Sequence, residues 1–267
     1  MNIQAFLQEN IRILEEAHIA SARLDCLILL EDMLNIDRSF ILAHPEMEPS
    51  DVQISILNKY ITRRKRQEPL AYIRGRSEFY GREFKVNKFV LVPRPESEDM
   101  ITILTALPLA LGARIADIGT GSGCLGITAK LEVPTSEVYL FDISRNALAM
   151  AEKNAQLHKT TIHLKQQNLL ENTVEQFDVI LANLPYVPND YPINEAASHE
   201  PKLALFSGPN GLDHYQVFWK QISELSHKPA YIITESMALQ HKALLDLAKG
   251  AHYELAKTAG LVQLFSR

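Results

Sequence analysis

Two short stretches of the 267-residue chain carry residue types that could do chemistry. The first places an acid, Asp117, before three glycines at alternate positions, Gly119, Gly121 and Gly123. Glycines let a ligand approach the backbone, and the amides of such a loop can face an anionic or carboxylate-bearing ligand. A second acid, Asp142, follows at about the 20-residue spacing at which an acid can bind a ribose diol. This pattern predicts a nucleotide-like cofactor.

The second stretch, Asn183-Leu184-Pro185-Tyr186, follows an apolar run. It resembles the Asn-Pro-Pro-Tyr motif of methyltransferases that act on planar nitrogen, with Leu184 in place of the first proline. An amide or exocyclic amine nitrogen is a poor nucleophile because its lone pair is delocalised, so alignment must carry the reaction. The Asn183 side chain and the Leu184 carbonyl could each accept one N–H. Tyr186 would stack on the planar group, and Pro185 biases the preceding residue toward an extended conformation.

The chain from about residue 97 onward predicts a mainly parallel, doubly wound α/β sheet, because apolar runs alternate there with helical stretches. A helix is expected near 97–107. The expected strands are 114–118, 137–142, 161–165, 177–182 and 230–235, followed by two C-terminal segments, 253–257 and 261–265.

The N-terminal part predicts a small helical bundle, because apolar residues recur there at helical spacing and glycine is absent before Gly75. Ser50 is the expected N-cap of a helix that ends near Arg66. Alternating apolar residues from about Glu78 predict a β-hairpin around Gly81 and Arg82.

Composition excludes several classes of protein. The 27 Lys+Arg and 32 Asp+Glu give a net charge of −5, so the chain is not a wholly basic nucleic-acid coat. The only two cysteines, Cys26 and Cys124, lie far apart, which argues against a zinc site or a disulfide framework. No metal is expected. No apolar run reaches the ~18 residues of a membrane span, so we expect a cytoplasmic protein with no membrane partner.

A resemblance extends over nearly the whole chain. The Asp-x-Gly-x-Gly-x-Gly order resembles the first motif of S-adenosylmethionine-dependent methyltransferases. Together with the second motif, segments 21–25, 68–81, 92–98 and 200–215 look like the HemK family of peptide chain release factor glutamine methyltransferases. The resemblance implies a Rossmann-like enzyme that uses S-adenosyl-L-methionine to methylate the glutamine amide of the release factor Gly-Gly-Gln loop. It also implies a helical substrate-recognition domain over 1–76, a hairpin linker over 77–95 and a catalytic domain over 96–267.

The resemblance also implies the site residues. The cofactor-binding set is Asp117, Gly119, Thr120, Gly121, Ser122, Gly123, Asp142, Asn168, Leu169 and Asn183. The glutamine would be held by Asn183, Leu184, Pro185 and Tyr186. Four positions depart from the family pattern: Ser97 replaces Thr, Asn168 replaces Asp, Leu184 replaces Pro, and Met237 replaces the glycine that follows Glu235. Asn168 keeps a side-chain carbonyl that can accept the adenine amino group.

Three alternatives stay open. The chain could be a ribosomal-protein glutamine methyltransferase, or a diverged member that binds cofactor or release factor with little activity. It could also be an adenine-N6 nucleic-acid methyltransferase, in which case the 11 basic side chains of 59–94 would contact phosphates. A protein substrate is favoured over nucleic acid, because little chain remains for a base-reading domain. The basic run would then steer a negatively charged partner.

Overall fold

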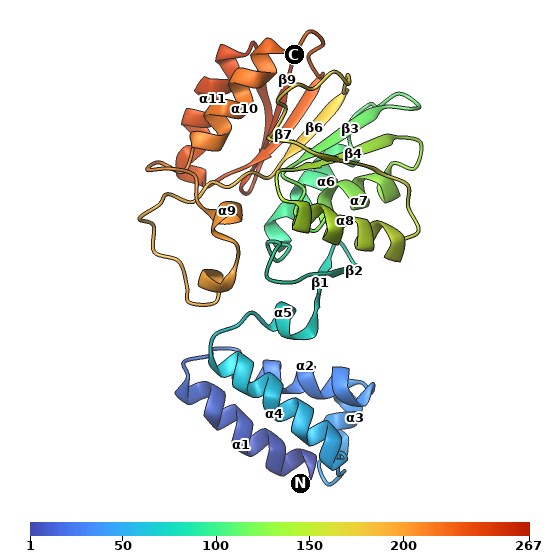
Figure 1. Cartoon of the computed structure of the whole chain (residues 1–267), viewed down its shortest axis with the longest axis vertical. Coiled ribbons are helices and arrows are strands. Elements are labelled where there is room, and N and C mark those ends of the chain that lie inside the picture. The colour runs from blue at the N-terminus through green and yellow to red at the C-terminus, as the bar shows by residue number, and fades with distance from the viewer. The chain divides into compact units, whose positions relative to one another are not determined.

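The computed structural model describes all 267 residues and divides them into two compact units (Figure 1). The first unit comprises Met1–Gly75 together with Ile193–His199. The second comprises Arg76–Pro192 and Glu200–Arg267. None of the helices combines the length and the apolar character that crossing a membrane requires.

The first unit is a bundle of five helices. They are α1 (Ile3–Glu16), α2 (Ala22–Leu34), α3 (Arg38–Ala43), α4 (Asp51–Lys65) and α5 (Leu70–Arg74). Buried apolar residues of α1, α2 and α4, among them Phe6, Leu30 and Leu57, form its core. Ser50 caps α4 and exchanges hydrogen bonds with Gln53, which confirms the predicted start of this helix. The helix ends at Lys65, which confirms its predicted end near Arg66.

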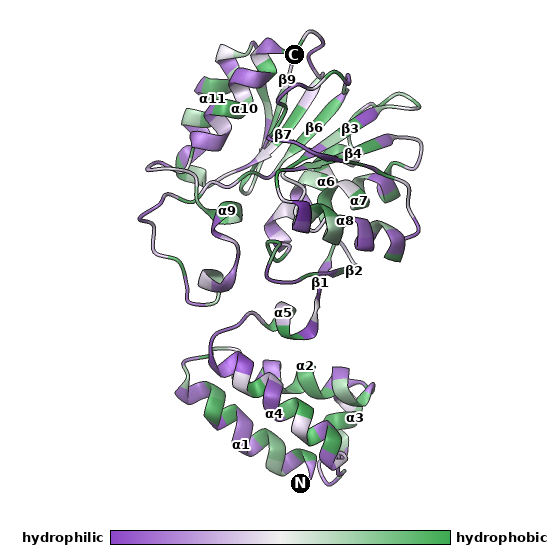
Figure 2. Cartoon of the chain, viewed as in Figure 1, coloured by the Kyte–Doolittle hydropathy of each residue, from purple (hydrophilic) through white to green (hydrophobic).

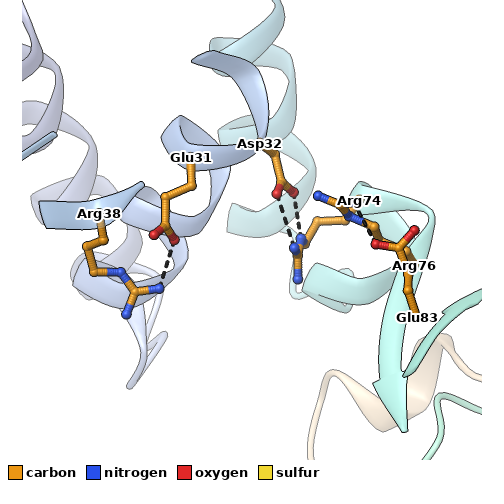
Figure 3. Close-up of polar contacts among 6 residues, drawn as sticks. All are labelled: Glu31, Asp32, Arg38, Arg74, Arg76 and Glu83. Carbon is orange, nitrogen blue, oxygen red and sulfur yellow. Dashed lines mark hydrogen bonds and ion pairs between the residues drawn. The ribbon is translucent and has the colours of Figure 1, made fainter. Parts of the chain in front are cut away.

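The basic run of 59–94, expected to steer a negatively charged partner, is largely paired with carboxylates of the same chain. In the first unit Arg64 bonds to the buried Asp25 at 2.6 Å. Figure 3 shows Arg74 bonded to Asp32, at 2.6 Å. Arg63 bonds to Glu68. In the second unit Arg76, Arg82 and Arg94 are paired with Glu83, Glu132 and Glu200 respectively. Local carboxylates therefore neutralise six of these arginines.

The second unit begins with the predicted hairpin, formed by β1 (Arg76–Phe79) and β2 (Arg82–Lys85). Its turn residues, Tyr80 and Gly81, have φ angles of 51° and 69°, so the turn lies one residue earlier than predicted. Positive φ at both central positions matches the twist of a two-residue hairpin turn.

A seven-stranded sheet forms the centre of the second unit, in the order β5-β4-β3-β6-β7-β9-β8. Its strands are β3 (Arg114–Ile118), β4 (Glu137–Asp142), β5 (His163–Gln166), β6 (Val179–Ala182), β7 (Tyr231–Glu235), β8 (Glu254–Ala259) and β9 (Val262–Ser266). The strands from β5 to β7 are parallel, and β9 and β8 are antiparallel. The predicted doubly wound sheet is confirmed, and Figure 2 shows its central strands β3 and β6 to be largely apolar.

The sheet is covered on both faces (Figure 1). The helices of the second unit are η1 (Pro95–Ser97), α6 (Glu98–Thr105), α7 (Cys124–Glu132), α8 (Arg145–Leu157), α9 (Lys202–Leu205), α10 (Asp213–Glu224), η3 (Ala238–Gln240) and α11 (His241–Gly250), and η2 (Ala197–His199) belongs to the first unit. Helices α6, α7 and α8 share one core cluster, and α10 and α11 share the other. Tyr215 and Trp219 lie in the core cluster shared by α10 and α11.

Candidate active site

The glycine-rich loop joins β3 to α7. Gly119, Gly121 and Gly123 have φ angles of 73°, 57° and 82°, which side-chain-bearing residues rarely adopt. The end of β4 holds this loop in place. The Gly121 amide donates to Asp142 Oδ2 at 2.9 Å, and the Gly119 amide donates to the Phe141 carbonyl at 2.9 Å. The strand order therefore brings the two predicted cofactor acids and the loop into one structure.

Asp117 supports the loop from the protein interior. Its Oδ2 accepts hydrogen bonds from Thr120 Oγ1 at 2.5 Å and from the Gly126 amide at 2.9 Å. Its Oδ1 is buried and has no hydrogen-bond partner. Burial raises the pKa of Asp117 to about 6, and the charge of Asp142 acts in the same direction. The carboxyl thus shapes the loop at an electrostatic cost.

A mostly apolar cavity opens at the carboxyl ends of the central strands. Eight of the predicted site residues line it: Gly119, Gly121, Asp142, Asn168, Leu169, Asn183, Leu184 and Pro185. Five others do not line it: Asp117, Thr120, Ser122, Gly123 and Tyr186. Part of the wall comes from residues that the sequence did not single out, namely Phe89, Val90, Leu91, Leu203, Ala204 and His214.

Asn183 follows directly on β6. Its Nδ2 donates to Ser97 Oγ at 2.8 Å, and its Oδ1 accepts no hydrogen bond from within the chain. The Leu184 amide lies 3.4 Å from the Tyr215 hydroxyl, while the Leu184 carbonyl accepts no intrachain hydrogen bond. Both acceptors expected from the motif are therefore uncommitted at the cavity wall.

Hydrogen bonds hold Tyr186 at its side chain and at its backbone. Its hydroxyl donates to Glu235 Oε1 at 2.9 Å, and its carbonyl accepts from Gln240 Nε2 at 2.8 Å. A Cβ at Gly211 would lie 2.1 Å from that same carbonyl, so the backbone of the motif is tightly enclosed. Burial raises the pKa of the Tyr186 phenol, and the charge of Glu235 adds to the rise. The phenol therefore stays protonated and acts as a donor.

Three residues of this region were missed as site residues: Ser97, Tyr215 and Glu235. The Tyr215 hydroxyl lies 2.8 Å from the Ala182 carbonyl and 2.6 Å from the Glu235 carbonyl, so it joins the ends of β6 and β7. One signal was present in the sequence, because Glu235 is an acid at the end of an expected strand. That Glu235 lies beside Asn183 depends on the order of the strands in the sheet, which could not be predicted from the sequence.

The rim of the cavity near Leu91 is held by an ion pair in which Glu200 is buried and Arg94 is partly exposed. Glu200 is 5% exposed, and its two oxygens accept from Arg94 Nη2 at 2.7 Å and from the Val92 amide at 3.1 Å. Glu200 is thus occupied with positioning this segment. No group of three or more His, Cys, Asp or Glu side chains is placed to hold a metal ion.

Comparison with known proteins agrees with this geometry. Residues 5–75 match the model of the PrmC N-terminal domain, and residues 100–199 match that of the methyltransferase small domain. A release factor glutamine methyltransferase of Koribacter versatilis is 36% identical over 80% of this chain and 78% of its own length. The Coxiella burnetii enzyme of that name is 32% identical over 86% and 84% respectively. The chain belongs to the release factor glutamine methyltransferase family. The predicted family resemblance is confirmed.

Other matches are methyltransferases with different names. A bifunctional methyltransferase of Rickettsia bellii is 33% identical over 88% of this chain, which spans only 48% of that protein. Among solved structures, the hMettl16 catalytic domain has a TM-score of 0.55 at 12% identity and covers 81% of both chains. A ribosomal protein L11 methylase from Lactobacillus delbrueckii has a TM-score of 0.52 at 20% identity, over 68% of this chain and 83% of that one. These structures confirm the Rossmann-like methyltransferase fold.

Proposed function

We propose that this chain transfers a methyl group from S-adenosyl-L-methionine to the side-chain amide nitrogen of the glutamine in the Gly-Gly-Gln loop of a peptide chain release factor. The observation that carries the proposal is the pair of uncommitted acceptors, Asn183 Oδ1 and the Leu184 carbonyl, beside the glycine-loop cavity. Family membership supplies the substrate class.

The cavity residues fit this cofactor. The Asn168 side chain lines the cavity without an intrachain hydrogen bond, so its carbonyl can accept from the adenine amino group. Asp142 keeps acceptor capacity for the ribose hydroxyls beyond its bonds to Gly121 and Ser144. A Cβ at Gly119 would approach Leu184 Cδ2 to 3.3 Å, so a side chain there would narrow the cavity. When bound, the cofactor supplies an electrophilic methyl on its sulfonium.

The reaction motif prepares the amide nitrogen. Asn183 Oδ1 and the Leu184 carbonyl each accept one N–H, which turns the face of the nitrogen toward the methyl group. Tyr186 supplies an aromatic face for the planar amide. The nitrogen gains the methyl and becomes acidic, and one of its two protons then leaves. The N–C bond forms as the S–CH₃ bond of the cofactor breaks and its electron pair stays on sulfur, and the N–H proton then leaves to water, so the step balances without a strong base.

The two units would divide the work. We propose that the helical residues 1–76 recognise the release factor, that 77–95 link them to the enzyme, and that 96–267 perform catalysis. The match of 5–75 to a dedicated N-terminal domain model supports this division. The pairing of six arginines with carboxylates favours a protein substrate over a phosphate backbone.

Asn183→Ala tests the mechanism. We expect methyl transfer to a release factor, followed with a labelled methyl group, to fall by on the order of a hundredfold through lost alignment. Cofactor affinity, measured by calorimetry, should stay within several-fold. Asn189→Ala, an exposed asparagine nearby, is the matched control and should keep full activity. An equal loss of cofactor affinity would show that Asn183 is first a cofactor contact.

A further inference from the structure

A buried carboxylate lies directly behind the reaction motif. Glu235 ends β7, and the pairing of Ala182 with Thr234 places it alongside Asn183. Glu235 is only 1% exposed, and its Oε2 accepts no hydrogen bond from within the chain. Burying a carboxylate is costly, so its presence here calls for a compensating role.

One donor of the site bonds this carboxylate directly, and Ser97 and Asn183 form a hydrogen-bonded pair beside it. The Tyr186 hydroxyl donates to Oε1 at 2.9 Å. Ser97, which is 3% exposed, accepts from Asn183 Nδ2 at 2.8 Å and has its own hydroxyl proton left to donate. Burial raises the pKa of Glu235, while hydrogen bonding with Ser97, Tyr186 and Asn183 opposes the rise and favours the ionised form.

An ionised carboxylate only accepts hydrogen bonds, whereas an amide both donates and accepts. When Glu235 accepts the Ser97 proton, Ser97 Oγ is left to accept from the Asn183 NH₂ group. That NH₂ group therefore faces inward, and the carbonyl Oδ1 faces the cavity. The opposite orientation would present NH₂ to the N–H of the substrate amide, which would place donor against donor. The chemistry of residue 235 thus decides which end of Asn183 meets the substrate.

We propose that Glu235 is a positioning residue that fixes the amide orientation of Asn183 and the ring of Tyr186 for methyl transfer. The role rests on the proposed function, since it concerns the same reaction. Glu235 acts through Asn183, Ser97 and Tyr186 and need not touch the substrate. A glutamine of the same shape at this position would supply an NH₂ group that can bond Asn183 Oδ1 and stabilise the unproductive orientation.

Glu235→Gln is the test, and Thr234→Val is its matched control. Thr234 is the preceding residue on β7, is fully buried and has a hydroxyl without a partner. At neutral pH we expect Glu235→Gln to lower kcat by roughly 10- to 100-fold with cofactor Kd within about threefold. In the Asn183→Ala background the same change should cost less than about threefold, because both changes remove one interaction. Thr234→Val should keep the wild-type kcat.

An unchanged kcat in Glu235→Gln, or a loss that multiplies fully with that of Asn183→Ala, would overturn the proposal. A second measurement does not depend on activity. The Asn183 side-chain NH₂ resonances, assigned by their disappearance in Asn183→Ala, should shift in Glu235→Gln and not in Thr234→Val. Unshifted resonances would overturn the positioning role. Absence of methyl transfer by the wild-type protein would instead count against the proposed function, so the two failures are distinguishable.

Discussion

At the residue scale, Asp117 links the stability of the protein to pH. Burial raises its pKa to about 6, whereas an unfolded aspartate titrates near pH 4. The folded protein therefore keeps a proton that the unfolded chain has already released. The free energy of unfolding should fall as the pH rises through this window and level off above about pH 6.

Asp117→Asn should remove this contribution. The asparagine carbonyl can still accept from Thr120 and Gly126, and no charge is buried. Relative to the wild type, the variant should be similarly stable near pH 4 and more stable above pH 6, by at most about 3 kcal/mol. Urea denaturation across this range measures the difference. A constant difference at all pH values would contradict the assignment.

Asp142→Ala should weaken cofactor binding by roughly 1.5–3 kcal/mol, since it removes a charge-assisted bond to the ribose. It also frees the amides of Gly121 and Ser144, which loosens the loop. Calorimetric titration measures the affinity. Asp178→Ala is the control, because Asp178 likewise accepts a backbone N–H, from Arg114, but at the start of β6. Equal affinities for wild type and Asp142→Ala would show that no such bond exists.

Residue types and spacing were enough to find part of the site. The glycine loop, Asp142 and Asn183 are recognisable because their chemistry is local in sequence. Ser97, Tyr215 and Glu235 were not recognisable, because their roles arise from contacts between residues far apart in the chain. Tyr215 lies in the core, and its hydroxyl also joins two strand ends.

At the element scale, the strands could be predicted to within about two residues from apolar patterning. The pattern does not encode the hydrogen bonds that end a strand. The expected strand 177–182 begins instead at Val179, although Asp178 still bonds to Arg114, Ala230 and Tyr231 next to the neighbouring strands. The apolar pattern also did not predict that β9 lies antiparallel between β7 and β8, since pairing partners are not visible in one strand's sequence.

The packing of α7 on the sheet depends on Gly126. A Cβ there would lie 2.0 Å from Leu140 Cδ2 and 3.0 Å from Asp117 Oδ2. Gly126→Ala should therefore destabilise the protein by about 1–3 kcal/mol, despite the better helix propensity of alanine. Gly250→Ala in α11 is the matched control, since no atom lies within 4 Å of its added Cβ. Urea denaturation compares the two, and equal stability would contradict this packing.

At the scale of the whole molecule, charge is organised differently from the sequence expectation. The basic run of 59–94 suggested a surface that attracts an anionic partner. In the structure Arg64 and Asp25 form an ion pair whose side chains are only 11% and 5% exposed. Breaking such a pair would leave a buried charge without its partner. The number of basic residues in a stretch of sequence overstates the positive potential of the folded surface, because folding places acidic side chains beside the basic ones.

The whole chain is proposed to methylate the glutamine of a release factor. Mass spectrometry of a release factor incubated with this protein and S-adenosylmethionine tests it most directly, beside a release factor whose loop glutamine is changed to asparagine. We predict the gain of one methyl group on that glutamine and none on the asparagine control. No gain on the glutamine, although the protein binds the cofactor, would contradict the account.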